Sequence, residues 1–115
     1  MPLTRAYELM IIVDGDAEES TKDILGQVDK LVQAGGGRIA TTDNWGRRRF
    51  AYEINHKWEG VYVVLEIVTE ASNLDDVERT LRLADEVVRH KLLRLPDREA
   101  TRRGLLGAAP TPAGA

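Results

Sequence analysis

The sequence has no cysteine among its 115 residues, which excludes disulfides, thiolate metal ligands and thiol nucleophiles. It has only two histidines, His56 and His90, and their separation matches no metal-ligand spacing such as HxxxH. No apolar run approaches the roughly 20 residues that a membrane-spanning helix needs. The opening residues MPLTRAYELM lack the charged, apolar and small-residue order of a signal peptide. We therefore expect a cytoplasmic protein with no metal site.

The side-chain arrangements that enzymes use are also missing. No nucleophile stands beside a base, and no pair of acids has a reason for a raised pKa. The glycine run at 35–37 looks like a phosphate loop, but it follows a predicted helix, whereas a phosphate loop precedes one. A helix stop explains these glycines better. We therefore expect no catalytic residues and no cofactor.

What the sequence does have is charge sorted into blocks. The net charge is −3 at pH 7, yet acidic blocks at 8–29 and 66–86 alternate with basic blocks at 44–58 and 87–103. Three consecutive arginines, Arg47, Arg48 and Arg49, follow a Trp-Gly pair in the first basic block. Such patterning says more about partners than about the fold. A solvated strand edge would explain the arginines, but two basic segments in an acidic chain favour an anionic partner.

Hydrophobic periodicity predicts strands at 5–13, 38–54, 61–69 and 87–95. A first helix is expected from the N-cap Asp16, with Glu19 as its capping-box partner, to the glycine run. A second helix is expected after Ser72 or Asn73, ending at the acids 85–86. We also expect a bulge near Gly46 and a hairpin loop at 55–60 that is longer than a two-residue turn.

The order strand, helix, strand, strand, helix, strand predicts an α+β fold of the ferredoxin-like split βαβ type. Two right-handed crossovers with a hairpin between them give a four-stranded antiparallel sheet with two helices on one face. This domain is expected to span residues 1–95. The small-residue segment 96–115 is expected to be a flexible tail.

The helices need apolar residues beneath them, and this need predicts the facing of each strand. In the third strand the set Val61, Val63, Leu65 and Ile67 is the best candidate, and in the second strand it is Phe50, Tyr52 and Ile54. The period of two then places Arg47 and Arg49 on the open face of the sheet, with Tyr62, Val64 and Val68, and places Arg48 on the helix side. Arginine suits phosphate, whereas an open apolar face suits a protein partner.

Four segments carry a resemblance to a known family: RAYELMIIVDGD, DNWGRRRFAYEI, EGVYVVLEI and ADEVVRHKLLR. Together they resemble the bacterial small-subunit ribosomal protein number six family from about Ala6 to Leu95. The block Trp45 to Arg49 matches the family's Trp-Gly-Arg-Arg motif. Gly15 departs from the pattern, because a proline is usual there, and Phe50 stands where leucine is usual.

The resemblance implies the ferredoxin-like fold and a structural role in the small ribosomal subunit, in the cytoplasm. It also implies pairing with small-subunit ribosomal protein eighteen, and joint binding of the central domain of the small-subunit ribosomal RNA. Neither a membrane nor a small-molecule substrate is expected as a partner. The alternative is a stand-alone ferredoxin-like module that regulates or self-associates through its open sheet.

The candidate residues divide into two groups. The expected RNA-binding residues are Arg5, Trp45, Arg47, Arg48, Arg49, Lys57, Arg89 and Lys91. The residues expected to contact a protein partner are Tyr52, Tyr62, Val64, Val68 and Arg94.

Overall fold

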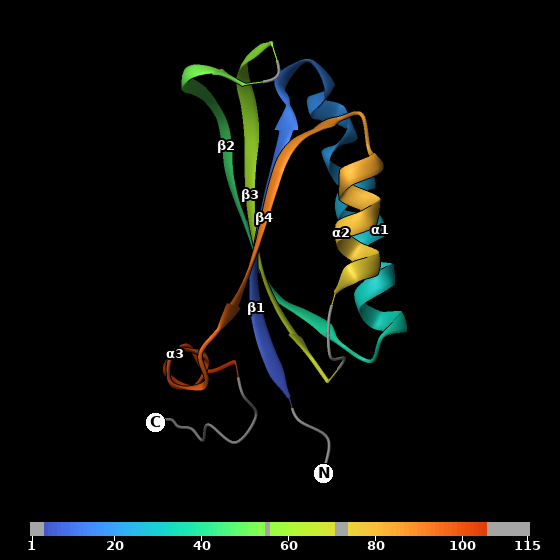
Figure 1. Cartoon of the computed structure of the whole chain (residues 1–115), viewed down its shortest axis with the longest axis vertical. Coiled ribbons are helices and arrows are strands. Elements are labelled where there is room, and N and C mark those ends of the chain that lie inside the picture. Colours follow the sequence, from blue (N-terminus) through green and yellow to red (C-terminus); the bar gives the residue numbers. More distant parts are fainter. Residues whose placement is uncertain (1–3, 55, 71–73, 106–115) are drawn as a thin grey trace.

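The computed structural model describes residues 4–54, 56–70 and 74–105 of the chain. Its elements are β1 (Arg5–Asp14), the 3-10 helix η1 (Gly15–Ser20), α1 (Thr21–Ala34), β2 (Arg38–Ile54), β3 (Lys57–Thr69), α2 (Asp75–Leu83), β4 (Val87–Leu95) and α3 (Asp97–Arg102). The strands form one antiparallel sheet in the order β2-β3-β1-β4. Helices α1 and α2 lie side by side on one face of it (Figure 1). The predicted ferredoxin-like α+β fold is confirmed.

The core lies between the two central strands and helices α1 and α2. In the β1–β3 register Leu9 stands opposite Leu65 and Ile11 opposite Val63, and all four side chains are buried. The period of two along each strand brings these residues to the helix-covered face, as predicted for β3. The core also contains Tyr7, Val13, Val61 and Ile67 from the strands, with Ile24, Val28, Val32, Leu74, Val77 and Leu81 above them.

The first crossover helix begins later than the sequence predicts. The Asp14 carboxylate accepts a hydrogen bond from the Asp16 amide at 2.9 Å, and this cap starts the 3-10 helix η1 instead of an α-helix. Ala17 then has a non-helical φ of −119°, so α1 begins only at Thr21. The helix ends at the glycine run as predicted, where Gly36 has a φ of 86°. Residues 72–73, expected to start the second helix, lie outside the described residues, and α2 begins at Asp75.

The bulge expected near Gly46 is confirmed. The β2–β3 register shifts by one residue between Asn44 and Gly46, and a second shift lies between Ile39 and Thr41. The Asn44 side chain accepts a hydrogen bond from the Gly46 amide at 2.7 Å, and Gly46 has a φ of 83° that favours glycine. Trp45 is therefore the extra residue that has no partner position on β3.

The facing predicted for Arg47 and Arg48 of β2 is wrong. Arg47 stands opposite the core residue Val61, on the helix-covered side, and Arg48 stands opposite Gly60, on the open side. Phe50 is buried on the open side, where its ring meets that of Tyr62 at 6.2 Å. The prediction assumed that the apolar side chains of β2 pack against the helices, whereas Phe50 is buried on the open face.

The β2–β3 connection is shorter than expected. Ile54 pairs with Lys57, so β3 begins four residues before the predicted Val61 and two residues separate the strands. The predicted hairpin loop at 55–60 is therefore wrong over residues 57–60, which continue the strand. His56, in the connection, has a φ of 64°.

The segment after β4 also differs from the expectation of a flexible tail. Asp97–Arg102 forms α3, which lies on the opposite side of the sheet from α1 and α2 (Figure 1). Ala100 and Leu105 are buried there against Ala6, Val68 and Leu95. These small contacts give the segment up to residue 105 a fixed place. Residues 106–115 of the expected tail lie outside the described residues. No helix within the described ranges is long and apolar enough to cross a membrane.

Gly60 on β3 allows β1 and Phe50 to pack closely against it. A Cβ atom at this position would lie 2.7 Å from Ile12 Cγ2, 2.9 Å from the Val13 carbonyl oxygen and 3.0 Å from Phe50 Cζ. We expect Gly60→Ala to lower the free energy of unfolding by about 1–3 kcal/mol, because the backbone oxygen cannot move away. Chemical denaturation measures this change.

Gly26→Ala is the matched control, because a Cβ at this exposed position of α1 meets nothing within 4 Å. It should raise the free energy of unfolding by about 0.5–1 kcal/mol, since alanine favours a helix. A Gly60→Ala protein as stable as the parent would contradict the close packing described here.

Candidate nucleic-acid interface

A shallow hollow of about 340 Å³ lies on the open face, toward the β2–β3 hairpin. Three of its lining residues are cations, and three are aromatic. No carboxylate lines it, although the chain as a whole is acidic. The lining residues are Met10, Ile12, Arg49, Phe50, Ala51, Tyr52, Ile54, Tyr62, Arg89 and Lys91.

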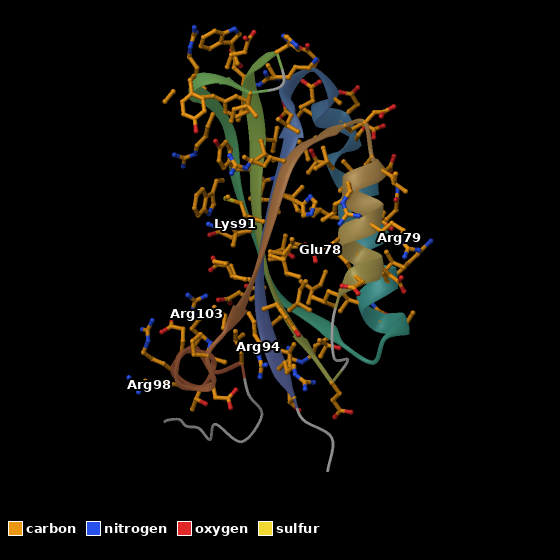
Figure 2. All side chains as sticks on the ribbon, viewed as in Figure 1. Glu78, Arg79, Lys91, Arg94, Arg98 and Arg103 are labelled. Carbon is orange, nitrogen blue, oxygen red and sulfur yellow. The ribbon has the colours of Figure 1, made fainter. Side chains whose placement is uncertain are left out.

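Strand register brings the basic residues of β4 to this hollow. Lys91 stands opposite Met10 on β1, and Arg89 stands opposite Ile12. Ile11, which lies between them on β1, belongs to the helix-covered core, so the period of two turns Arg89 and Lys91 to the open face. Figure 2 shows Lys91 on the side of β4 away from α2. Both side chains are exposed, and their charge is available to a ligand.

Aromatic rings line up beside the hollow at the bulge of β2. The Trp45 and Tyr62 rings are stacked with centroids 6.3 Å apart and planes 5° apart, and Phe50 meets Tyr62 edge-on. Trp45 remains 46% exposed, and its Nε1 donates a hydrogen bond to Asp43 Oδ2 at 2.9 Å. The guanidinium carbon of Arg48 lies 5.6 Å from the Trp45 ring centre. An exposed ring beside a cation is suited to stack on a base and contact its phosphate.

Arg49 and Tyr52 complete the hairpin side of the hollow. The guanidinium carbon of Arg49 lies 5.9 Å from the Trp58 ring centre, within the range of a cation–π interaction. Tyr52 is 64% exposed, so most of its ring is free to pack on a partner. A planar guanidinium held over a ring keeps its outer edge open for a phosphate or a carboxylate.

Arg47, a predicted RNA-binding residue, is occupied within the chain. Its guanidinium donates to Glu59 Oε1 at 2.9 Å, to the Gly15 carbonyl oxygen at 2.7 Å and to Glu18 Oε1 at 3.1 Å. The hydrogen bonds to Glu59 and Glu18 raise the pKa of Arg47 above its usual value. Arg47 therefore ties the β2–β3 hairpin to η1, and its position at the bulge serves the fold.

Lys57 has a similar role at the start of β3. Its ammonium group lies 2.9 Å from Asp14 Oδ2. The hydrogen bond between them lowers the pKa of the Asp14 carboxyl and raises that of the Lys57 amine. Asp14 also caps η1, so this ion pair joins the hairpin to the first crossover.

The remaining predicted residues divide between the two faces. Arg94 stands opposite the core residue Tyr7, and Arg5 opposite Thr69, which places both on the helix-covered side of the sheet. Val64 stands opposite Met10 on the open face, next to Tyr62 along that face. Val68 is also on the open face but is buried in the cluster that α3 covers.

The structure thus gathers Arg49, Tyr52, Tyr62, Arg89 and Lys91 around one hollow, with Trp45, Arg48 and Val64 adjoining. Sequence reasoning missed Met10, Ile12 and Phe50, which form its apolar floor. For Met10 and Ile12 the signal was present, because they alternate with the core residues of β1. For Phe50 the signal was misleading, because its alternation with Tyr52 and Ile54 suggested a strand face that packs against the helices.

Comparisons with known proteins agree on one family. The family model described as Ribosomal protein S6 matches residues 6–94. The protein named small ribosomal subunit protein bS6 from Acidothermus cellulolyticus is 43% identical over 94 residues, covering 81% of this chain and 97% of that protein. The protein of the same name from Carboxydothermus hydrogenoformans is 38% identical over 93 residues, covering 80% and 97%.

A solved structure agrees with the sequence comparisons. The crystal structure of 30S ribosomal protein S6 from Thermotoga maritima superposes with a TM-score of 0.78 at 31% sequence identity. The match covers 89% of this chain and 97% of that chain. The strand order and the helix-covered face described above are therefore those of a known fold.

The different roles of neighbouring arginines can be separated by thermal unfolding. We expect Arg47→Ala to lower the midpoint temperature, because Glu18, Glu59 and the Gly15 carbonyl oxygen lose a shared donor. Arg48→Ala is the matched control, since its guanidinium lies over an exposed ring, and it should leave the midpoint unchanged. Equal midpoints for the two variants would show that the hairpin tie is unimportant.

Proposed function

The chain belongs to the ribosomal protein S6 family, and from this premise we propose that it binds the central domain of the small-subunit ribosomal RNA jointly with small-subunit ribosomal protein eighteen. The resemblance found in the sequence is confirmed, and the chain is a structural protein of the small subunit of the cytoplasmic ribosome. This family is not an enzyme class. The joint binding is our proposal, and the hollow on the open face is the observation that supports it most.

The hollow has the chemistry that RNA requires. Arg49, Arg89 and Lys91 surround it without a carboxylate among them, and Arg48 and Trp45 lie next to it. Cations of this kind contact phosphates, and exposed rings stack on unpaired bases. The rest of the chain is acidic, so its long-range field opposes RNA while this local patch attracts it. A small basic patch on an acidic protein fits a binder that shares its RNA site with another protein.

The floor of the same hollow has the chemistry that a protein partner requires. Met10, Ile12 and Phe50 form it, and Tyr52, Tyr62 and Val64 extend it along the open face. Apolar surface that no helix covers is typical of a protein interface. A basic partner would also be attracted by the acidic blocks of the chain, which speeds encounter and fixes orientation.

The proposed interface therefore revises the residues expected from the sequence. It keeps Trp45, Arg48, Arg49, Arg89 and Lys91 for RNA and Tyr52, Tyr62 and Val64 for the protein partner. It leaves out Arg47 and Lys57, whose hydrogen bonds lie within the chain, and Val68, which α3 covers. It also leaves out Arg5 and Arg94, which lie on the helix-covered side.

A gel-shift titration tests the proposal. The labelled probe is a central-domain fragment of the small-subunit ribosomal RNA, titrated with this chain, with protein eighteen, and with both together. We expect tight binding only when both proteins are present, and an affinity that falls as salt increases, because phosphate contacts release counterions.

The double variant Arg89→Ala with Lys91→Ala should weaken this joint binding at least tenfold. It should also reduce the slope of log K against log salt by about 1.4–1.8, the value for two lost phosphate contacts. The matched control removes the same charges from the opposite layer, with Lys30→Ala on α1 and Arg79→Ala on α2. Figure 2 shows Arg79 pointing away from the sheet. Equal losses for both doubles would place the interface elsewhere, and no binding by the parent chain would refute the proposed function.

A further inference from the structure

Two glutamates of the central strands lie side by side on the open face. Glu8 on β1 stands directly opposite Glu66 on β3, in a strand pair whose other open-face residues are mostly apolar. Like charges at directly opposite positions destabilise a sheet. Both side chains are also partly buried, with exposed fractions of 31% and 20%, so water screens their repulsion only in part. A cation placed between Glu8 and Glu66 would therefore stabilise this part of the sheet.

Arg103, just after α3, supplies that cation. Its Nη1 atom lies 3.1 Å from Glu8 Oε1 and 2.8 Å from Glu66 Oε2, and its Nε donates to Glu99 Oε2 at 2.6 Å. One guanidinium thus joins α3 to both central strands. Figure 2 shows Arg103 on the sheet side of α3, whereas Arg98 points away from the sheet.

Apart from Arg103, few side chains attach α3 to the sheet. Ala100 and Leu105 are the two buried apolar residues of this segment, and they contact Ala6, Val68 and Leu95. A helix of six residues is far below the length that is stable by itself in water. α3 therefore keeps its form only while it is docked, and its docking depends on one arginine and two apolar side chains.

α3 also lies outside the part of the chain that the family model matches. The family model ends at residue 94, before α3 begins at Asp97. The surface beneath α3, in contrast, is built from β1, β3 and β4, which lie within the match except for Arg5 and Leu95 at their ends. The attached segment and the surface beneath it thus belong to different parts of the sequence.

The surface that α3 covers would attract a basic protein segment and repel RNA. Without Arg103 it would present two adjacent carboxylates beside an apolar strip of Ala6, Val68 and Leu95. Carboxylates repel phosphate but bind guanidinium strongly, often through paired hydrogen bonds. The occupant in the free chain has this chemistry, since it is an arginine next to the apolar residues Ala100 and Leu105.

This covered surface is continuous with the hollow. Glu8 and Met10 are successive open-face residues of β1, and Glu66 and Val64 are successive open-face residues of β3. Met10 lines the hollow. A protein lying on the hollow therefore reaches the edge of the covered surface within two residues along either strand.

We propose that residues 97–105 occupy, in the free chain, a docking site for an arginine-bearing segment of the protein partner, which displaces α3 when it binds. This inference rests on the proposed function, because it concerns the same partner. α3 acts as an internal competitor, so the apparent affinity for the partner is reduced in proportion to the fraction of chains in which the site is open.

Arg103→Ala in the full-length chain tests the proposal, with Arg98→Ala as the matched control on the same helix. We expect Arg103→Ala to accelerate hydrogen exchange of the amides in 97–105 and to tighten binding of purified protein eighteen three- to tenfold. Arg98→Ala removes the same charge without touching the glutamates and should change neither quantity. When the unsubstituted chain is bound to protein eighteen, amides 97–105 should exchange faster than in the free chain, whereas those of Phe50 and Tyr62 should exchange more slowly.

Two results would refute the displacement of α3. Arg103→Ala could leave binding unchanged or weaken it, which would make the segment neutral or part of the interface. Alternatively, amides 97–105 could become better protected in the parent complex, which would show that α3 stays docked.

A peptide experiment keeps this test separate from that of the proposed function. A synthetic peptide of residues 96–105 is added to the isotopically labelled Arg103→Ala chain and followed by NMR. We expect it to shift the amide signals of Glu8 and Glu66, and the same peptide with alanine at position 103 to have no effect. If the parent chain does not bind protein eighteen, the proposed function is wrong and the peptide alone decides whether the site takes an arginine. No response to either peptide refutes the site.

Discussion

The packing of two apolar strips against helices α1 and α2 is the constraint on which the rest of this structure depends. β1 and β3 are the central strands, and both present their alternate apolar residues to the same side. Because α1 and α2 both pack on that side, they leave the other face of the sheet uncovered, apart from the part beneath α3 (Figure 1). That second face carries a basic and aromatic hollow at one end and an acidic, apolar surface under α3 at the other.

The features that the sequence predicted well are those governed by strict alternation or by an unambiguous stop. The β3 set from Val61 to Ile67 lies in the core as expected, and β4 spans the predicted residues 87–95. The glycine run ends α1, because Gly36 has a conformation that other residues rarely adopt. In each case the local pattern and the tertiary environment require the same structure, so a reading of the pattern is sufficient.

The features that were missed are those that the local pattern does not determine. The facing of β2 was inferred from the apolar set that begins at Phe50, but Phe50 is buried on the open face, so Arg47 and Arg48 have the opposite facing from the predicted one. α3 escaped prediction for another reason. Its six residues show no apolar stripe, and its docking depends on contacts with Glu8 and Glu66, which are distant in sequence. No local reading of residues 96–105 contains that information, although the charge blocks and the alternation of the strands did indicate a basic, aromatic open face.

The strand order has a consequence for how the chain folds while it is being synthesised. β1 leaves the ribosome first but lies in the middle of the sheet, with β3 and β4 as its neighbours. Its first hydrogen-bonded partner is complete only at Thr69, and its second only at Leu95. The nascent chain therefore carries an unpaired apolar strand until β3 has emerged, and closure of the sheet waits for β4.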